Sequence, residues 1–86
     1  MKSVRTKKFK ELLAKLPEDV QKQAKEAYRI FEDDPFHPGL NFECINKKKS
    51  WWSARVNDKY RAVGIRKGDT IVWFFIGTHT RYDRFL

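Results

Sequence analysis

The sequence contains few of the residues that cross-link, kink or interrupt a chain. It has one cysteine, three prolines and four glycines in 86 residues. A single cysteine excludes an intramolecular disulfide framework, and the sequence shows no His/Cys cluster that would suggest zinc. The longest apolar run, Ile71–Ile76, is far too short to span a membrane. The first fifteen residues are too charged for a signal peptide, so we expect a soluble, cytoplasmic protein without a cofactor.

Apolar and basic residues are plentiful. Hydrophobic residues make up 41% of the chain and include thirteen aromatics, which is enough for the core of one domain over residues 1–86. The net charge is +8, and the basic excess lies in residues 1–15 and 41–86, whereas residues 16–40 are net acidic. Such an excess indicates a polyanionic partner: nucleic acid, anionic lipid or an acidic protein. The alternative is a basic surface that only keeps the protein soluble.

Two helices are predicted in the first half of the chain. Apolar residues follow helical spacing in one group, Phe9, Leu12, Leu13 and Leu16, and in a second, Val20, Ala24, Ala27, Tyr28 and Phe31. Pro17 separates the groups, and the acids Glu18 and Asp19 behind it are typical of a helix start. Asp33-Asp34-Pro35 ends the second helix, because the residue before proline avoids the α region. Almost no loop separates the helices, which predicts a helical hairpin.

The second half of the chain shows the two-residue period of strands. Leu40, Phe42 and Cys44 alternate with polar residues and predict a first strand, and residues 51–56 alternate in a second. A third strand is predicted over residues 60–66. Residues 70–76 are apolar on both faces, which predicts a central strand. We therefore expect an α+β fold, in which the N-terminal helical hairpin packs on a three- to four-stranded antiparallel sheet with a short C-terminal tail.

Two arginines face each other across a predicted hairpin. If Asn57-Asp58-Lys59 form the loop, Arg55 lies directly opposite Arg61. Like charges in this position destabilise a sheet, so the fold has little reason to place them there unless an anion lies between them. Paired guanidinium groups suit phosphate, and we interpret the two arginines as an anion site. The alternatives are two solvated arginines, or arginines paired with Glu43 or Asp83.

A basic and aromatic run precedes the second predicted strand. It consists of Lys47, Lys48, Lys49, Trp51 and Trp52. Lysines attract phosphate, and an exposed indole can stack on a base. By alternation Trp52 belongs to the core side of the strand, whereas Trp51 shares a face with Arg55 and is the expected contact. The alternative is that the lysines are simply solvated.

One histidine follows the last predicted strand. His79 comes directly after Gly77-Thr78, a position from which a rigid scaffold can present a side chain. An imidazole can exchange a proton near neutral pH, although a structural histidine fits the sequence equally well. The sequence contains no glycine-rich phosphate loop, nucleophile elbow or metal-ligand spacing. Acid–base chemistry in the second half therefore falls to His, Lys, Arg or Tyr.

Several short motifs together resemble the RelE/ParE toxins of toxin–antitoxin systems over nearly the whole chain. They are Leu16-Pro17 between the helices, His37-Pro38-Gly39-Leu40, the strand pair from Trp52 to Gly64, and the segment from Ile76 to Arg84. Each motif is weak, and the ensemble carries the resemblance. It implies an α+β toxin fold and, in the RelE branch, mRNA cleavage in the ribosomal A site.

The resemblance also implies roles for individual residues. RelE enzymes use basic residues to activate the ribose 2′-hydroxyl and to stabilise the phosphorane. Carried over to this chain, Arg55 and Arg61 bind the scissile phosphate and His79 transfers a proton. Tyr82 stands for the catalytic tyrosine of the tail. The residues expected to hold RNA are Lys47, Lys48, Lys49, Trp51 and Arg81.

The chain departs from the RelE pattern at two positions. Ser53 stands where RelE enzymes often carry a basic residue, and the family's tyrosine spacing falls on Phe85 instead of Tyr82. Two alternative functions follow: a ParE-like inhibitor of DNA gyrase, and a non-catalytic module that binds antitoxin or RNA. Retention of the basic cluster favours the nuclease, because a gyrase inhibitor has no need of it.

The partners implied by the resemblance are all anionic. They are an acidic cognate antitoxin that covers the basic surface, mRNA in the ribosomal A site, and operator DNA bound together with the antitoxin. A partly disordered antitoxin could fold as it binds. No membrane partner is expected.

Overall fold

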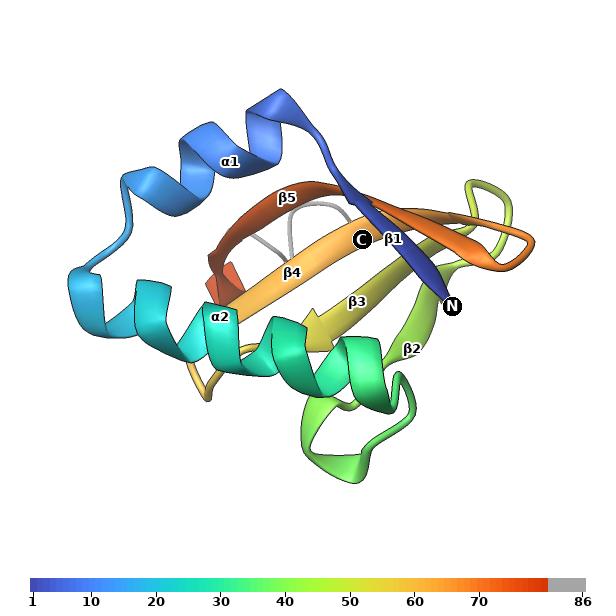
Figure 1. Ribbon diagram of the computed structural model, residues 1–86. Coiled ribbons are helices and arrows are strands. Elements are labelled where there is room, and N and C mark those ends of the chain that lie inside the picture. Colours follow the sequence, from blue (N-terminus) through green and yellow to red (C-terminus); the bar gives the residue numbers. More distant parts are fainter. Residues whose placement is uncertain (81–86) are drawn as a thin grey trace.

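Two helices lie over one face of a mixed sheet in the computed structural model, which describes residues 1–80 (Figure 1). Five strands make up the sheet within these residues, in the order β1-β5-β4-β3-β2. The elements along the chain are β1 (Lys2–Arg5), α1 (Lys7–Ala14), α2 (Glu18–Asp33), the 3₁₀ turn η1 (Pro38–Leu40), β2 (Glu43–Asn46), β3 (Trp51–Arg55), β4 (Tyr60–Lys67) and β5 (Thr70–Thr78).

The two predicted helices are confirmed, and side chains fix where they begin. Thr6 precedes α1, and its hydroxyl accepts a hydrogen bond from the Phe9 N–H at 3.1 Å, which caps the helix. α2 follows Pro17 and carries two acids in its first turn, where the helix dipole favours them. Gln21 joins the helices, because its side-chain amide donates to the Leu16 carbonyl at 2.9 Å.

The main core lies between the helices and the sheet. Phe31 of α2 is its most deeply buried aromatic residue among those described, at 2% exposure. The Phe31 ring packs edge-to-face on Trp73 of β5 at 5.3 Å and on Phe42 at 5.0 Å between ring centroids. Edge-to-face pairs of this kind stabilise a core beyond their buried area. This core therefore holds the helices on the sheet. None of the helices in residues 1–80 is both long and apolar enough to cross a membrane.

The predicted sheet is wrong in its number of strands and in its uniform direction. β1 adds an edge strand that pairs in parallel with β5, from Lys2 opposite Thr70 to Arg5 opposite Trp73. The strand has one large apolar residue, Val4, and that residue is 50% exposed. A four-residue strand on an edge needs no alternating apolar pattern, because neither of its faces fills the core. β1 is a strand only because it pairs with β5, and its own four residues do not indicate that pairing.

The first predicted antiparallel strand begins later than expected. Leu40 is buried, but it lies in η1, and β2 starts only at Glu43. His37 stabilises the turn by accepting a hydrogen bond from the Gly39 N–H at 3.0 Å on its Nδ1 atom. Asn41 then adopts a left-handed conformation with φ of 45°, which an extended strand cannot contain. Leu40 and Phe42 are therefore both buried because they flank the left-handed residue Asn41, and not because they share one face of a strand.

The register of the β3–β4 hairpin matches the prediction. Arg55 lies opposite Arg61, and Ser53 lies opposite Val63 two residues further along the strands. β4 continues antiparallel to β5, with a bulge between Val63 and Gly64. Because successive residues alternate between faces, Arg55 and Arg61 share the sheet face that lies away from the main core. That face carries a second, smaller cluster around Val63 and Phe75.

Candidate functional site

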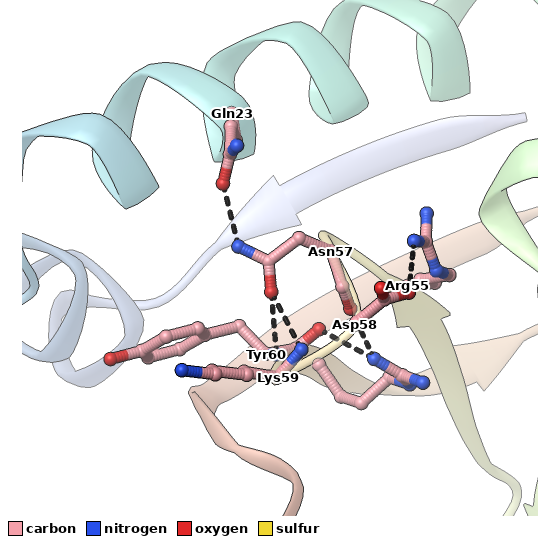
Figure 2. A network of polar contacts seen from close by, with 7 residues as sticks. Gln23, Arg55, Asn57, Asp58, Lys59 and Tyr60 are labelled. Atoms are coloured by element: carbon pink, nitrogen blue, oxygen red, sulfur yellow. Dashed lines mark hydrogen bonds and ion pairs between the residues drawn. The ribbon is translucent and has the colours of Figure 1, made fainter.

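Asn57 organises the loop between β3 and β4. Its Oδ1 atom accepts hydrogen bonds from the backbone N–H groups of Lys59 at 2.8 Å and Tyr60 at 2.9 Å. Its Nδ2 atom donates to Oε1 of Gln23, on α2, at 2.6 Å (Figure 2). A single side chain thus closes the loop and ties it to a helix. Side-chain bonds of this kind to the following backbone are the usual reason for asparagine in tight turns.

The anion next to Arg55 comes from the same loop. The Arg55 Nη2 atom donates to Oδ1 of Asp58 at 2.6 Å (Figure 2). Of the two partners considered from the sequence, Glu43 does not supply this bond, and Asp83 lies outside the described residues. The hydrogen bond and the charge of Arg55 hold the pKa of Asp58 below its ordinary value, and the charge of Arg61 lowers it further. Both arginines therefore act on one carboxylate, which stands 94% exposed at the loop tip.

Arg61 is turned onto the backbone of the loop. Its Nη1 atom donates to the Tyr60 carbonyl at 3.0 Å and also to the Asn57 carbonyl. These bonds satisfy part of the five-donor guanidinium and leave it half-buried. The two arginines that oppose each other in the sheet thus reach separate acceptors of the same loop. This arrangement reduces their mutual repulsion in the absence of an external anion.

His79 is anchored beside this loop by its backbone. Its N–H donates to the Lys59 carbonyl at 2.6 Å, just beyond the point where Tyr60 pairs with Thr78. The imidazole is exposed. A shallow groove of about 390 Å³ lies here, lined by Asp58, Lys59, Arg61, Thr78, His79 and Thr80. The structure therefore brings three of the predicted catalytic positions, Arg55, Arg61 and His79, to one end of the sheet.

The predicted RNA-binding lysines lie at the other end of β3. Lys47, Lys48 and Lys49 are exposed in the turn before β3, whereas Arg55 is the last residue of that strand. A strand rise of about 3.3 Å per residue separates Trp51 from Arg55 by roughly 13 Å. Trp51 is half-buried: its ring packs on Phe74 at 5.7 Å, and the Lys49 Nζ lies 4.5 Å from the ring centroid. Part of its surface is therefore used for packing.

Two predicted site residues, Arg81 and Tyr82, lie outside the described residues. Ser53, where RelE enzymes often carry a basic group, is buried at 3% exposure on the arginine face of β3. Within residues 1–80, no group of three or more His, Cys, Asp and Glu side chains gathers as metal ligands would. The groove thus offers one guanidinium group, from Arg61, an ammonium group, an imidazole, hydroxyls and the carboxylate of Asp58. The guanidinium of Arg55 is bonded to that carboxylate.

Sequence reasoning missed the residues that hold the arginines. Asn57 and Asp58 were interpreted only as turn formers, and Gln23 was given no role. The spacing of Arg55 and Asp58, three residues apart across a turn, is a signal that could have identified the ion pair. Nothing in the sequence pairs Gln23 with Asn57, because that contact depends on how α2 lies over the sheet.

Comparison with known proteins assigns the chain to a family. The profile of the ParE-like toxin domain matches residues 18–84. The chain belongs to the ParE-like toxin family. It is therefore a member of the RelE/ParE superfamily, as the motifs predicted. A comparison with curated proteins gives no significant match.

Solved structures of the RelE/ParE superfamily share the fold at low sequence identity. The RelB–RelE antitoxin–toxin complex from Methanococcus jannaschii superposes with a TM-score of 0.75 at 20% identity, over 96% of this chain and 99% of that chain. The RelE–RelB complex from Pyrococcus horikoshii gives 0.70 at 19% identity, over 93% and 96%. The YoeB/ParE toxin from Agrobacterium tumefaciens gives 0.66 at 19% identity, over 92% and 99%. At these identities the likeness concerns the fold.

Proposed function

We propose that this ParE-like chain is the toxin of a type II toxin–antitoxin module and cleaves mRNA in the ribosomal A site. The observation that carries the proposal is the meeting of Arg55, Arg61 and His79 at one end of the sheet. Two cations opposite each other on neighbouring strands suit a phosphate with developing negative charge. An imidazole beside them suits proton transfer.

The proposed reaction uses the RNA's own nucleophile. The ribose 2′-hydroxyl loses its proton and attacks the neighbouring phosphorus, and charge accumulates on the phosphate oxygens in the transition state. The bond from phosphorus to the 5′-oxygen then breaks and this oxygen takes up a proton, which leaves a 2′,3′-cyclic phosphate and a 5′-hydroxyl. Arg61 and Arg55 stabilise that charge once their guanidinium groups turn from the loop to the phosphate. His79 moves a proton to or from the reacting oxygens. The groove at Arg61 and His79 is the proposed place for the scissile phosphate.

The lysine turn gives the RNA a second point of attachment. Lys47, Lys48 and Lys49 lie beyond Trp51, at the start of β3. Trp51 itself is roughly 13 Å from Arg55 along the strand, which is about four stacked nucleotides at 3.4 Å each. A strand bound along this face passes over Trp51, whose exposed part can stack on a base. Arg81 and Tyr82 complete the proposal as an RNA contact and a second proton-transfer group.

A cognate antitoxin is part of the same proposal. The solved relatives from Methanococcus jannaschii and Pyrococcus horikoshii are both complexes of RelE with RelB. A chain of net charge +8 attracts an acidic partner, which neutralises the toxin by covering its basic face. The complex would bind operator DNA through the antitoxin.

Inhibition of DNA gyrase is the second candidate. It is favoured by the ParE-like profile that matches residues 18–84. A gyrase inhibitor acts by binding, so its activity would survive the loss of the imidazole of His79. This expectation separates it from the nuclease.

The test is cleavage of mRNA on programmed ribosomes by the purified chain. We expect cuts within the A-site codon, and a loss of at least about a hundredfold in rate for Arg61→Ala and for His79→Ala. Lys67→Ala, at the far end of β4, is the matched control and should cleave at the wild-type rate. A folded chain that binds ribosomes without cutting mRNA contradicts the proposal, and inhibition of gyrase supercoiling by that chain would support the second candidate.

A further inference from the structure

The arginine pair already has an anion within the chain. The Asp58 carboxylate accepts a hydrogen bond from the Arg55 guanidinium at 2.6 Å, and Asp58 also lines the groove that holds Arg61 and His79. Its pKa is lowered by Arg55 and, to a smaller extent, by Arg61. A carboxylate and a phosphate offer an arginine the same kind of paired oxygen acceptor. Asp58 therefore occupies the interaction that a phosphate would use.

The loop keeps Asp58 in place for this contact. Asn57 fixes the backbone on both sides of Asp58, because its side chain accepts from the Lys59 and Tyr60 N–H groups and donates to Gln23 of α2 (Figure 2). Arg55 reaches Asp58 from the end of β3, three residues earlier. The acid is thus tethered close to Arg55, whereas a phosphate has to arrive from solution.

We propose that the carboxylate of Asp58 competes with the RNA phosphate for Arg55. Asp58 thereby lowers the affinity of the site for phosphate, and it must be displaced from Arg55 when RNA binds. This inference rests on the proposed function and adds a residue that sets its affinity. Asp58 is a positioning residue in this scheme: it holds Arg55 in the free protein and leaves it in the complex. Its exposure makes the exchange inexpensive, because an exposed ion pair is weak and is screened by salt.

The experiment measures the affinity of the full chain for a single-stranded uridine hexanucleotide. Asp58→Asn keeps the size of the side chain and removes its charge, and we expect about two- to fivefold tighter binding, the range that an exposed ion pair allows. Asp58→Glu restores a carboxylate and should return the affinity towards the wild-type value. Asp69→Asn is the matched control, because it removes the same charge from the turn at the other end of β4.

A double-mutant cycle with Arg55→Ala shows whether Asp58 acts through Arg55. The gain from Asp58→Asn should disappear when Arg55 is absent. In the ribosomal assay, Asp58→Asn should lower KM and leave kcat unchanged, which a merely structural role would not produce. An equal gain from Asp69→Asn, a gain that persists without Arg55, or no gain at all would overturn the inference.

The two proposals fail in different ways. If the wild type cleaves mRNA and Asp58→Asn changes neither binding nor KM, the internal competitor is wrong and the nuclease stands. If the wild type does not cleave, but Asp58→Asn strengthens oligonucleotide binding only when Arg55 is present, the competitor stands and the nuclease is wrong.

Discussion

β4 has a turn at each end, and the two turns are held in different ways. The turn before it, residues 57–59, is closed by the side chain of Asn57 and carries the Arg55–Asp58 ion pair. The turn after it, residues 67–69, depends on Gly68, which adopts a left-handed conformation with φ of 59°. Arg66 adds one bond to the Gly68 carbonyl at 3.2 Å. One turn is shaped by polar side chains and the other by backbone freedom.

The difference indicates where a ligand can act. Interactions between exposed side chains can be exchanged for interactions with a ligand, because both are made in water at similar cost. The Gly68 turn depends mainly on a backbone conformation that glycine adopts at no steric cost, so it has few side-chain interactions that a ligand could replace. The arginine turn therefore offers interactions that a phosphate can replace, whereas the glycine turn offers few.

The largest expected effect is on the salt dependence of RNA binding, and it concerns the lysines in a third turn, the one before β3. Changing Lys47, Lys48 and Lys49 together to Ala should weaken RNA binding and leave kcat on ribosomes unchanged, because these residues bind RNA without reaching the reacting atoms. Because three phosphates are then no longer neutralised, the slope of log affinity against log salt should become shallower by about 2, a difference of about twentyfold between roughly 50 and 200 mM salt. Filter binding over that range measures it. An unchanged slope would place the RNA elsewhere.

Asn57→Ala should destabilise the fold by about 1–2 kcal/mol. The change removes a half-buried side chain that makes three hydrogen bonds, and each is worth about 0.5–1.5 kcal/mol, of which water restores a part. Urea unfolding measures the loss. Gln23→Ala is the control, because it removes only the bond to α2 and should cost less than half as much. Equal losses would mean that the loop is held by the helix alone.

Gly68→Ala should cost about 1 kcal/mol, all of it from the backbone. A Cβ at this position would meet nothing within 4 Å, so the cost is the strain of the left-handed conformation alone. Gly68→Asn should recover much of the loss, since asparagine tolerates this conformation. Thermal unfolding of the two variants tests the point, and RNA affinity should be the same in both.

The smallest expected effect is on the titration of Asp58. Its folded pKa is lowered, so the ion pair stabilises the fold above the ordinary carboxyl pKa, and this contribution is lost as the pH falls through the lowered value. Carboxyl NMR should find the pKa of Asp58 below the ordinary range in the wild type and closer to it in Arg55→Ala. A pKa that does not respond to Arg55→Ala would show that the ion pair is absent in solution.

The sequence predicts this molecule well where structure is local. The two helices follow from apolar spacing, and the opposition of Arg55 and Arg61 follows from the length of one turn. β1 could not be predicted, because its partner lies near the far end of the described chain and its own four residues carry no pattern.

The candidate site was predicted only in part for the same reason. His79 meets Lys59 because the end of β5 pairs with the start of β4, and Asn57 meets Gln23 because α2 crosses the sheet. These contacts depend on tertiary packing. The pairing of Arg55 with Asp58 is local, but it depends on a loop conformation that Asn57 imposes and that composition does not reveal.

The parallel pairing of β1 with β5 sets an order on folding. β3 and β4 are joined by a short loop and can pair early, because short loops close with little loss of entropy. β1 must wait until its partner, which begins at Thr70, has been synthesised. A nascent chain that ends near Lys67 would therefore carry the arginine hairpin without His79. β5, which joins β1 to the arginine hairpin, also leads directly into His79, so the candidate site can become complete only after β5 has been synthesised.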